Sequence, residues 1–251
     1  MSLAFRYAVA MQVPSLPAVL AGAFSRQGKG HAKNDDRYGL FDARDEIVRG
    51  AQRGAIYAVA DGVGSTRDGA AAAEVVIQHL ASFFSSSLHP SENLLIDVVE
   101  AADAEVRMAI GSASTVTGVW MAEKVVSIFN VGDSGVFLQR EGSLHRMTPI
   151  QQRGGGLSAW VGMGPSIRHM TFLRRMPMQV GDRYLICSDG ILDALTVDEL
   201  STLLAAHGDD LIDEVQQRLE DRGHTDDATM IQLRILEQDR GTPPQDATDL
   251  P

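Results

Sequence analysis

The sequence predicts an α+β fold in a single domain. Short apolar and β-branched runs bounded by glycine and polar residues recur along the chain, as is typical of strands. Two of these runs flank the turn-like Ala122-Glu123-Lys124, which indicates a hairpin in an antiparallel sheet. Other stretches carry apolar residues at helical spacing. The 251 residues are enough to bury a substantial core, and we expect one domain over residues 1–237 and a disordered polar tail at 238–251.

Composition narrows the functional classes. A formal net charge of -11 and a pI near 5.0 argue against nucleic acid or an anionic membrane as the main partner. No apolar run approaches the length of a membrane span, so we expect no membrane anchor. The single cysteine, Cys187, excludes an internal disulfide framework, and its place in an apolar run predicts a buried, unreactive thiol. We therefore expect a cytoplasmic protein, and we expect it to be a monomer.

The first predicted elements enclose a polar loop. We expect strands at residues 18–24 and 38–41, joined by the loop 25–36, which contains Gly28-Lys29-Gly30 and ends in two aspartates. No glycine follows at the third position that a dinucleotide-binding loop requires, and Gly-Lys-Ser/Thr is absent. The basic side chains of this loop remain candidates for binding phosphate.

The next segment joins a buried strand to a loop that carries a carboxylate. Residues 56–60 form an apolar, β-branched run, Asp61 follows directly, and a helix is expected at 69–85. Asp-Gly on its own is also a common turn. However, a second apolar run at 184–187 again leads into an Asp-Gly pair, at Asp189, and then into a helical pattern. Two aspartates at strand ends favour one shared site.

The middle of the chain adds a further acid at a strand end. We expect a helix at 93–110 and paired strands at 115–121 and 125–131. The second strand leads into Gly132-Asp133-Ser134-Gly135, a string that also occurs in secreted serine proteases. The disulfide-rich setting of those proteases is absent, so we interpret Asp133 as another acid in a strand-end loop.

The remaining pattern completes the predicted fold. Glycine-rich residues 151–164 are expected to form a mobile surface segment. The other predicted elements are strands at 136–139, 144–147, 168–174 and 230–236, and helices at 200–204 and 211–219.

Acidic residues therefore recur where predicted strands begin or end. They are Asp35, Asp36, Asp61, Asp133, Asp189, Asp226 and Asp227. Two carboxylates about 4 Å apart repel by roughly 4 kcal/mol at an effective dielectric of about 20, so a cluster of them requires protons or cations. No histidine or cysteine cluster at metal spacing accompanies them, which favours the hard cations Mg²⁺ or Mn²⁺ over Zn²⁺.

Five motifs stand in a characteristic order along the chain. They are Asn34-Asp35-Asp36, Ala60-Asp61-Gly62-Val63-Gly64, Asn130-Val131-Gly132-Asp133-Ser134, Cys187-Ser188-Asp189-Gly190 and Asp226-Asp227-Ala228-Thr229. Each is weak alone, but the ordered set resembles the metal-dependent protein serine/threonine phosphatases of the PPM (type 2C) family in their bacterial form. The resemblance extends from about Gly22 to Leu236. It implies a four-layer αββα sandwich, in which two antiparallel β-sheets are flanked by α-helices.

The resemblance also implies roles for the central acids. Asp61 is expected to bridge two metal ions, with the Gly62 carbonyl on the second ion, and Asp189 and Asp226 are expected to bind the first. The family chemistry implies two tightly bound Mn²⁺ or Mg²⁺ ions and a third, weaker one. Two metals about 3.5 to 4 Å apart lower the pKa of a bridging water, and the hydroxide attacks phosphorus in line. Asp61, Asp189 and Asp226 are thus the candidate catalytic residues.

The resemblance places the other acids around this pair of metals. Asp35 takes the position of a family glutamate that contacts the second metal largely through water, and Asp36 follows it. Asp133 resembles the acid associated with the looser third metal.

Phosphate binding departs from the family pattern. An arginine usually holds the substrate phosphate where this chain has His31, and an asparagine usually follows the last metal ligand where this chain has Asp227. Phosphate binding is therefore expected to rest on His31, on Lys29 or Lys33, or on the metals alone, and our candidates are His31 and Lys33.

The expected function is metal-dependent hydrolysis of phosphoserine and phosphothreonine in phosphoproteins, opposing a serine/threonine kinase. The alternative is a catalytically weak relative that binds phosphoproteins or other partners as a regulatory module. The missing arginine favours the alternative. The complete set of Asp61, Asp189 and Asp226 favours the enzyme, because a binding module has no reason to gather mutually repelling carboxylates.

Overall fold

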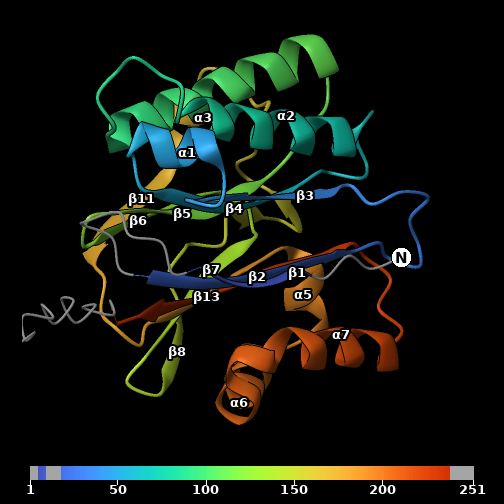
Figure 1. Ribbon diagram of the computed structural model, residues 1–251. Helices are drawn as coiled ribbons and strands as arrows, with labels where there is room; N and C mark the ends of the chain where they lie inside the picture. The colour runs from blue at the N-terminus through green and yellow to red at the C-terminus, as the bar shows by residue number, and fades with distance from the viewer. Residues whose placement is uncertain (1–4, 10–17, 238–251) are drawn as a thin grey trace, which may run out of the picture.

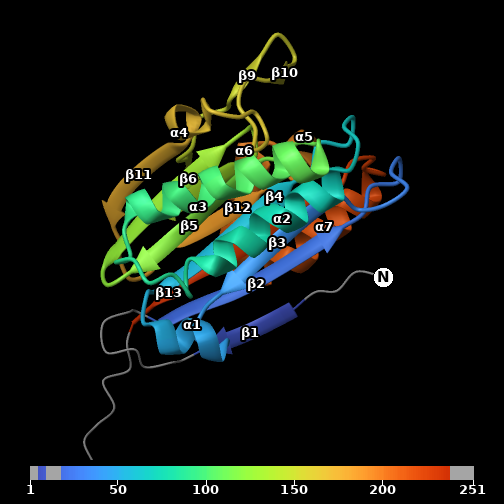
Figure 2. The same ribbon diagram turned by 90° about the horizontal axis from the view of Figure 1, so that it is seen from above.

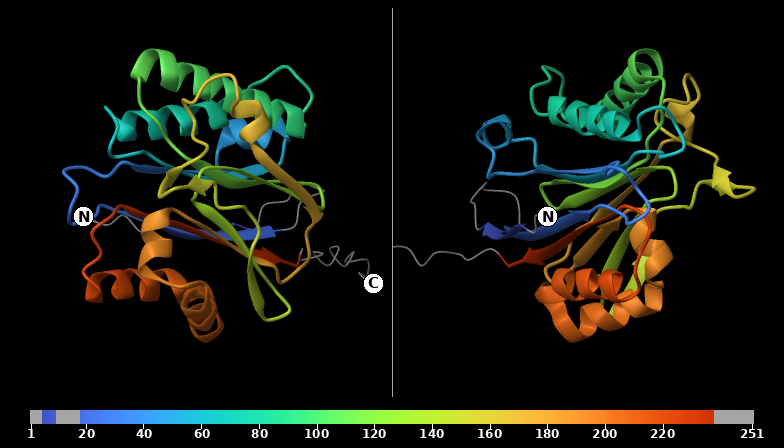
Figure 3. Two further views of the ribbon diagram at one scale, coloured as in Figure 1. Left: turned by 180° about the vertical axis from the view of Figure 1, so that it is seen from behind. Right: turned by 90° about the vertical axis from the view of Figure 1, so that its right-hand side faces the viewer.

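Two antiparallel sheets lie face to face between two layers of helices (Figures 1 and 3). The computed structural model describes residues 5–9 and 18–237. The first sheet, in the order β11-β6-β5-β4-β3, contains β3 (Asp36–Phe41), β4 (Ala55–Asp61), β5 (Val116–Ala122), β6 (Val125–Val131) and β11 (Phe172–Pro177). The second, in the order β1-β2-β13-β12-β7-β8, contains β1 (Phe5–Val9), β2 (Ala18–Arg26), β7 (Gly135–Arg140), β8 (Ser143–Arg146), β12 (Arg183–Cys187) and β13 (Ala228–Leu236). The predicted α+β sandwich is confirmed.

Helices cover the outer face of each sheet (Figure 1). The helices on the side of the first sheet are α1 (Glu46–Ala51), α2 (Gly69–Ser82), α3 (Glu92–Glu105) with a following π-helical turn (Val106–Ile110), and α4 (Ile167–Met170). Those on the side of the second sheet are α5 (Asp189–Ala194), α6 (Val197–His207), a 3-10 turn (Gly208–Asp210) and α7 (Leu211–Asp221). Side-chain caps fix the helix starts: Asp68 accepts from the N–H of Ala71 in α2, and Thr196 and Glu199 form a capping box at α6.

Apolar side chains fill the three spaces between the four layers. In β4, Ile56 packs toward the helices and Tyr57 packs between the sheets. In β12, Leu185 packs toward α6 and α7, and Ile186 packs between the sheets. Successive residues of a strand point to opposite faces, so a strand that is covered on both faces must be apolar at every position. This explains the continuous apolar runs in the sequence.

The strand register brings the predicted acids to one end of the sandwich. Asp36, the first residue of β3, pairs with Asp61, the last residue of β4. In the second sheet, the end of β12 pairs with the start of β13, so that Asp189 follows one strand and Asp226 precedes the other. In antiparallel neighbours the end of one strand lies beside the start of the next. Acids that are far apart in the sequence therefore lie close together at one end of the sandwich.

The strand predicted at 168–174 is wrong in its first half. Residues Ile167–Met170 form α4, and the strand β11 occupies Phe172–Pro177. Ile167 is buried in the core beneath the helices, and Arg168 forms ion pairs with Asp97 and Glu100 of α3. These tertiary contacts select a helical turn over local strand propensity. The short elements α1 and β1 have no counterpart among the predicted elements.

A short ribbon interrupts the segment at residues 151–164. Strands β9 (Gln152–Arg153) and β10 (Gly156–Leu157) pair as a two-stranded sheet that projects from the body of the molecule (Figure 2). The mobility predicted for this segment stays a prediction. The tail predicted at 238–251 lies outside the described residues, so the domain boundary at residue 237 also stays a prediction. Among the described residues, no helix is both long and apolar enough to cross a bilayer.

Candidate active site

A pocket of about 680 Å³ opens at the end of the sandwich where the acids converge. The candidate metal ligands that line it are Asp61, Gly62, Asp133, Asp189 and Asp226. Asp61 ends a strand of the first sheet, Asp189 and Asp226 adjoin strands of the second, and Asp133 lies in the connection from β6 to β7. The pocket thus collects carboxylates from both sheets.

Backbone contacts hold Asp61 and Gly62 in place. The N–H of Asp61 donates to Oγ1 of Thr115 at 3.1 Å, and its carbonyl accepts from the N–H of Thr115 at 2.7 Å. The N–H of Gly62 donates to the carbonyl of Asp35 at 3.3 Å. A Cβ at residue 62 would lie 2.2 Å from the carbonyl oxygen of Gly69, so only glycine fits there. The end of β4 is therefore a rigid support for a carboxylate.

The carboxyl groups at this end of the sheets are crowded. Removal from water, together with the charges of Asp36 and Asp189, raises the pKa of Asp61 well above its usual value. Removal from water also raises the pKa of Asp36 to about 7 and that of Asp189 to about 6. The cluster therefore retains protons near neutral pH unless cations replace them.

The donor atoms fit hard cations. Oδ1 of Asp35 and Oδ1 of Asp36 are buried and make no hydrogen bond within the described part of the chain. Neither Asp35 nor Asp36 lines the pocket itself. The carboxylates that line it, and the carbonyl of Gly62, are the ligand types that Mg²⁺ and Mn²⁺ prefer. Within residues 5–9 and 18–237, no three His, Cys, Asp or Glu side chains already form a metal-binding group.

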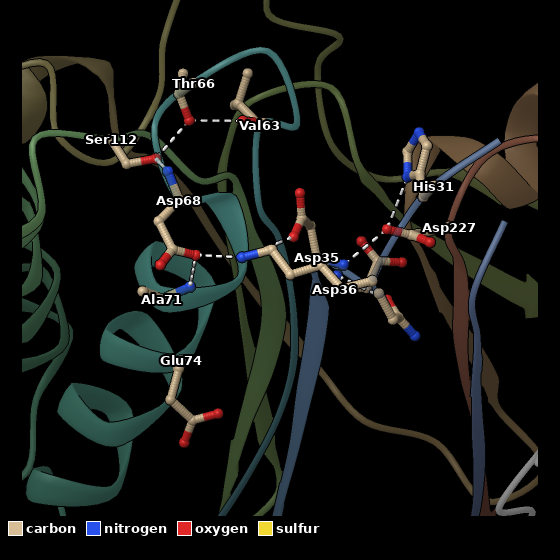
Figure 4. Close-up of polar contacts among 12 residues, drawn as sticks. His31, Asp35, Asp36, Val63, Thr66, Asp68, Ala71, Glu74, Ser112 and Asp227 are labelled. Carbon is tan, nitrogen blue, oxygen red and sulfur yellow. Dashed lines mark hydrogen bonds and ion pairs between the residues drawn. The ribbon is translucent and has the colours of Figure 1, made fainter.

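His31 reaches the pocket from the loop between β2 and β3 (Figure 4). Its Nδ1 lies 3.0 Å from Oδ2 of Asp227, and its Nε2 lies 3.5 Å from Oδ1 of Asp226. The hydrogen bond with Asp227 raises the pKa of His31 above its usual value. Asp227 also accepts from the N–H groups of Gly28 at 2.8 Å and Asp35 at 2.7 Å. Asp227, to which the sequence assigned no role, thus fixes both the loop and the imidazole.

Lys33, the other candidate for phosphate binding, does not line the pocket. Its ammonium lies 2.5 Å from Oδ1 of Asp68 and 3.7 Å from Oδ1 of Asp35. Asp68 caps α2, so Lys33 ties the polar loop to the start of that helix. The structure brings His31, but not Lys33, into the pocket.

Asp133 has a partner that the sequence did not reveal. Nε2 of Gln152 in β9 donates to Oδ2 of Asp133 at 2.6 Å, and Arg146 donates to the carbonyl of Asp133 at 2.6 Å. No local pattern signals the Gln152 contact, because it depends on the ribbon lying beside the β6–β7 connection. Oγ of Ser134 bonds Oγ1 of Thr115 at 2.9 Å rather than a base. The protease alternative therefore finds no support at this serine.

The sandwich and its carboxylate pocket define a class, the metal-dependent phosphatase fold, and comparison with known proteins identifies the family. The family model described as "Protein phosphatase 2C" matches residues 27–231, so the chain belongs to the protein phosphatase 2C family. The serine/threonine protein phosphatase PstP of Mycobacterium tuberculosis is 27% identical over 244 residues, which cover 84% of this chain and 46% of PstP. The chain thus spans about half the length of the curated relatives it matches.

Solved structures share the fold. The catalytic domain of PstP, in complex with two manganese ions, has a TM-score of 0.71 at 20% identity and covers 87% of this chain and 99% of that domain. Stp1 from Staphylococcus aureus has a TM-score of 0.75 at 21% identity, covering 90% of this chain and 99% of Stp1. PppA, a regulatory component of the T6SS in Pseudomonas aeruginosa, has a TM-score of 0.70 at 21% identity, covering 87% and 98%. These similarities confirm the predicted fold, and the family model confirms the predicted family.

Proposed function

We propose that this protein hydrolyses phosphoserine and phosphothreonine in proteins with the aid of Mn²⁺ or Mg²⁺. The observation that carries the proposal is the convergence of Asp61, Asp133, Asp189 and Asp226 on one pocket from both sheets. Carboxylates that raise one another's pKa are unfavourable in a purely structural role, and the cost is offset when they bind cations.

We propose metal ligands at several of the strand ends. In this proposal Asp61, Asp189 and Asp226 would hold the first ion, and Asp61 with the carbonyl of Gly62 would hold the second. The further acids assigned to metals, directly or through water, are Asp35, Asp36 and Asp133, the last at a weaker third site. When bound, the cations would activate water and neutralise charge on the phosphoryl group.

We propose His31 as the residue that holds the substrate phosphate. Its Nδ1 is hydrogen-bonded to Asp227, whereas Nε2 has only a longer contact of 3.5 Å with Oδ1 of Asp226, so Nε2 is the nitrogen able to donate to a phosphate oxygen. The neighbouring carboxylates favour the protonated imidazole, and a protonated imidazole forms the stronger bond to an anion. No arginine or lysine occurs among the described residues that line the pocket. His31 is therefore the basic side chain of the described lining that would hold a phosphate.

The second candidate function is a regulatory module that binds phosphoproteins and turns them over weakly. Both ring nitrogens of His31 face carboxylates, and a histidine in this place offers less permanent charge than an arginine. This observation favours weak phosphate binding. The regulatory module would therefore bind phosphoproteins in the same pocket as the enzyme, but with a lower rate of hydrolysis.

The proposed partners are a phosphoprotein substrate and an opposing serine/threonine kinase. We also propose that the chain acts as a monomer in the cytoplasm. The buried Cys187, whose pKa burial raises to about 12, fits a reducing compartment because it is neither paired nor reactive.

Hydrolysis of a phosphothreonine peptide with and without Mn²⁺ tests the proposal. We expect turnover that requires the metal, that EDTA abolishes, and that Asp61→Asn reduces by several orders of magnitude. Glu123→Gln is the matched control, because it also removes one negative charge, at an exposed residue of the turn between β5 and β6 that does not line the pocket. Absence of turnover in folded, metal-loaded protein would favour the regulatory module.

A further inference from the structure

One side of the pocket is apolar, in contrast to the carboxylates elsewhere in its lining. Leu157 of β10 and Trp160, which follows the ribbon, both line the cavity and are half-buried. Neither has a place in the chemistry proposed above.

Trp160 is held so that its side chain faces the pocket. The residues on either side of it, Ala159 and Val161, are fully buried in the core beneath the helices. Val161 also exchanges two backbone hydrogen bonds with Ser114, at 2.7 and 3.1 Å. Both neighbours are thus anchored in the core, whereas the side chain of Trp160 is half-buried and lines the cavity. The indole is therefore presented to the cavity by a fixed backbone.

Leu157 is placed beside the acidic part of the pocket. It pairs directly with Gln152 across the ribbon, and residues that are directly opposite in an antiparallel pair project from the same face. Gln152 in turn donates to Asp133. The isobutyl group of Leu157 therefore lies on the face of the ribbon that meets the metal-binding end of the pocket.

The size and charge of the pocket indicate what this apolar wall contacts. A volume of about 680 Å³ is in the range that accommodates a ligand of many atoms, so the phosphate group alone leaves much of it unfilled. His31 is the one basic residue among the described residues of the lining, against several aspartates. An acidic or polar neighbour of the phosphorylated residue would meet repulsion or lose solvation there. An apolar neighbour gains contact area at Leu157 and Trp160.

We propose that Leu157 and Trp160 form a subsite that selects an apolar side chain next to the phosphorylated residue of the substrate. The proposal rests on the proposed function, because it names the substrate class of the same pocket. Leu157 and Trp160 would thus determine specificity, and the carboxylates would hold the cations needed for hydrolysis.

Matched phosphothreonine peptides test the subsite through a ratio of rates. Leucine or aspartate is placed on either side of the phosphothreonine in turn, and kcat/KM is measured with Mn²⁺. At one of the two positions we expect the leucine peptide to be favoured roughly tenfold or more, the scale on which hydrophobic pockets discriminate. Leu157→Ser should reduce this preference severalfold. Because the measure is a ratio, a general change in turnover cancels.

Ile150→Ser is the matched control. Ile150 is an apolar residue, 58% exposed, that precedes the same ribbon but does not line the pocket. This variant should keep both the turnover and the leucine preference of the wild type. No preference at either position in the wild type, or a preference that Leu157→Ser leaves intact, would overturn the proposal.

Tryptophan fluorescence gives a second measurement that needs no catalysis. The chain has two tryptophans, Trp120 and Trp160, and Trp120 is 7% exposed and donates to the carbonyl of Arg53. Non-hydrolysable phosphonate analogues of the leucine peptide should change the emission at lower concentration than those of the aspartate peptide. Trp160→Phe, which retains Trp120, should lose the change. If it persists in Trp160→Phe, the subsite is wrongly placed.

The two measurements separate the subsite from the proposed function. If the protein hydrolyses no phosphopeptide, the proposed function fails, and the fluorescence titration alone decides whether Leu157 and Trp160 bind an apolar neighbour. If hydrolysis proceeds without any sequence preference, the function stands and the subsite does not.

Discussion

At the residue scale, the contact between His31 and Asp227 would make the proposed binding of phosphate by His31 depend on pH. The hydrogen bond from Asp227 raises the pKa of His31, so the imidazole keeps its proton to a higher pH than a free histidine does. We expect KM for a phosphothreonine peptide to rise on the order of tenfold as the pH passes upward through this raised pKa, because a charged hydrogen bond to phosphate is lost. Profiles of KM from about pH 6 to about pH 9 at saturating Mn²⁺ measure the effect.

Two variants of this pair sharpen the experiment. His31→Arg should flatten the rise and lower KM, because guanidinium stays charged throughout. Asp227→Asn removes the charge and keeps an oxygen acceptor for only one of the two loop N–H groups, so the rise in KM should move to lower pH. A profile of His31→Ala that superimposes on that of the wild type would show that His31 does not hold phosphate.

Some site residues were predictable from sequence and others were not, for a physical reason. Asp61 directly follows an apolar run that is buried on both faces, and Asp189 follows another such run after one intervening residue. The local sequence pattern therefore predicts that both acids lie at strand ends. The contacts of Asp227 with His31 and of Gln152 with Asp133 join loops from different parts of the chain. Such contacts depend on side-chain geometry that no local pattern encodes.

At the element scale, one buried carboxylate in α3 anchors the far end of the ribbon segment. Asp103 is 3% exposed, and its carboxylate accepts from the N–H groups of Gly162 at 2.7 Å and Gly164 at 3.1 Å. We expect Asp103→Ala to lower the free energy of unfolding by about 2–4 kcal/mol, because two N–H groups lose their acceptor in a buried setting. Urea unfolding followed by circular dichroism measures the loss.

Asp97 supplies the control on the same helix. It is about half exposed, and its carboxylate contacts Arg168 at the surface. Asp97→Ala should cost less than about 1 kcal/mol, since exposed ion pairs contribute little. Equal losses in the two variants would mean that Asp103 contributes no more than a surface ion pair.

The same scale shows where sequence reasoning about elements succeeds. The long helices α2 and α3 and the hairpin of β5 and β6 carry enough periodic residues to be recognised. At residues 167–177 the pattern is short, and burial of Ile167 beneath α3 decides between helix and strand. The boundary between α4 and β11 is therefore a property of packing rather than of local propensity.

At the scale of the whole molecule, the strand order creates the site. The sequence shows that acids adjoin strands, but it does not show which strands are neighbours. In the structure, β3 pairs with β4 in one sheet, and β12 lies between β13 and β7 in the other. This arrangement places all the strand ends that adjoin these acids at the same end of the sandwich. Contacts between residues this distant in sequence leave no periodic signal. The neighbouring strands could therefore be anticipated only from the family resemblance, which implied the two-sheet sandwich.

Because the acids lie together at one end of the sandwich, we expect the free energy of unfolding to depend on both pH and bound metal. In metal-free protein, Asp36 with a pKa of about 7, Asp189 with a pKa of about 6, and Asp61 hold protons that the unfolded chain releases above about pH 4. The folded state binds more protons in this window, so the free energy of unfolding should fall as the pH rises from about 4 to about 7. Mn²⁺ replaces these protons, and its stabilising effect should therefore grow with pH.

Thermal melting in EDTA and in Mn²⁺, at about pH 5 and about pH 8, measures this coupling. We expect the metal to raise Tm by several degrees more at the higher pH. Asp61→Asn removes one charge from the cluster, so in EDTA at the higher pH it should melt at or above the wild type, while gaining less from Mn²⁺. Glu123→Gln, in the exposed turn between β5 and β6, should behave as the wild type does. If Asp61→Asn melts well below the wild type in EDTA, Asp61 stabilises a turn, and the metal site is misplaced.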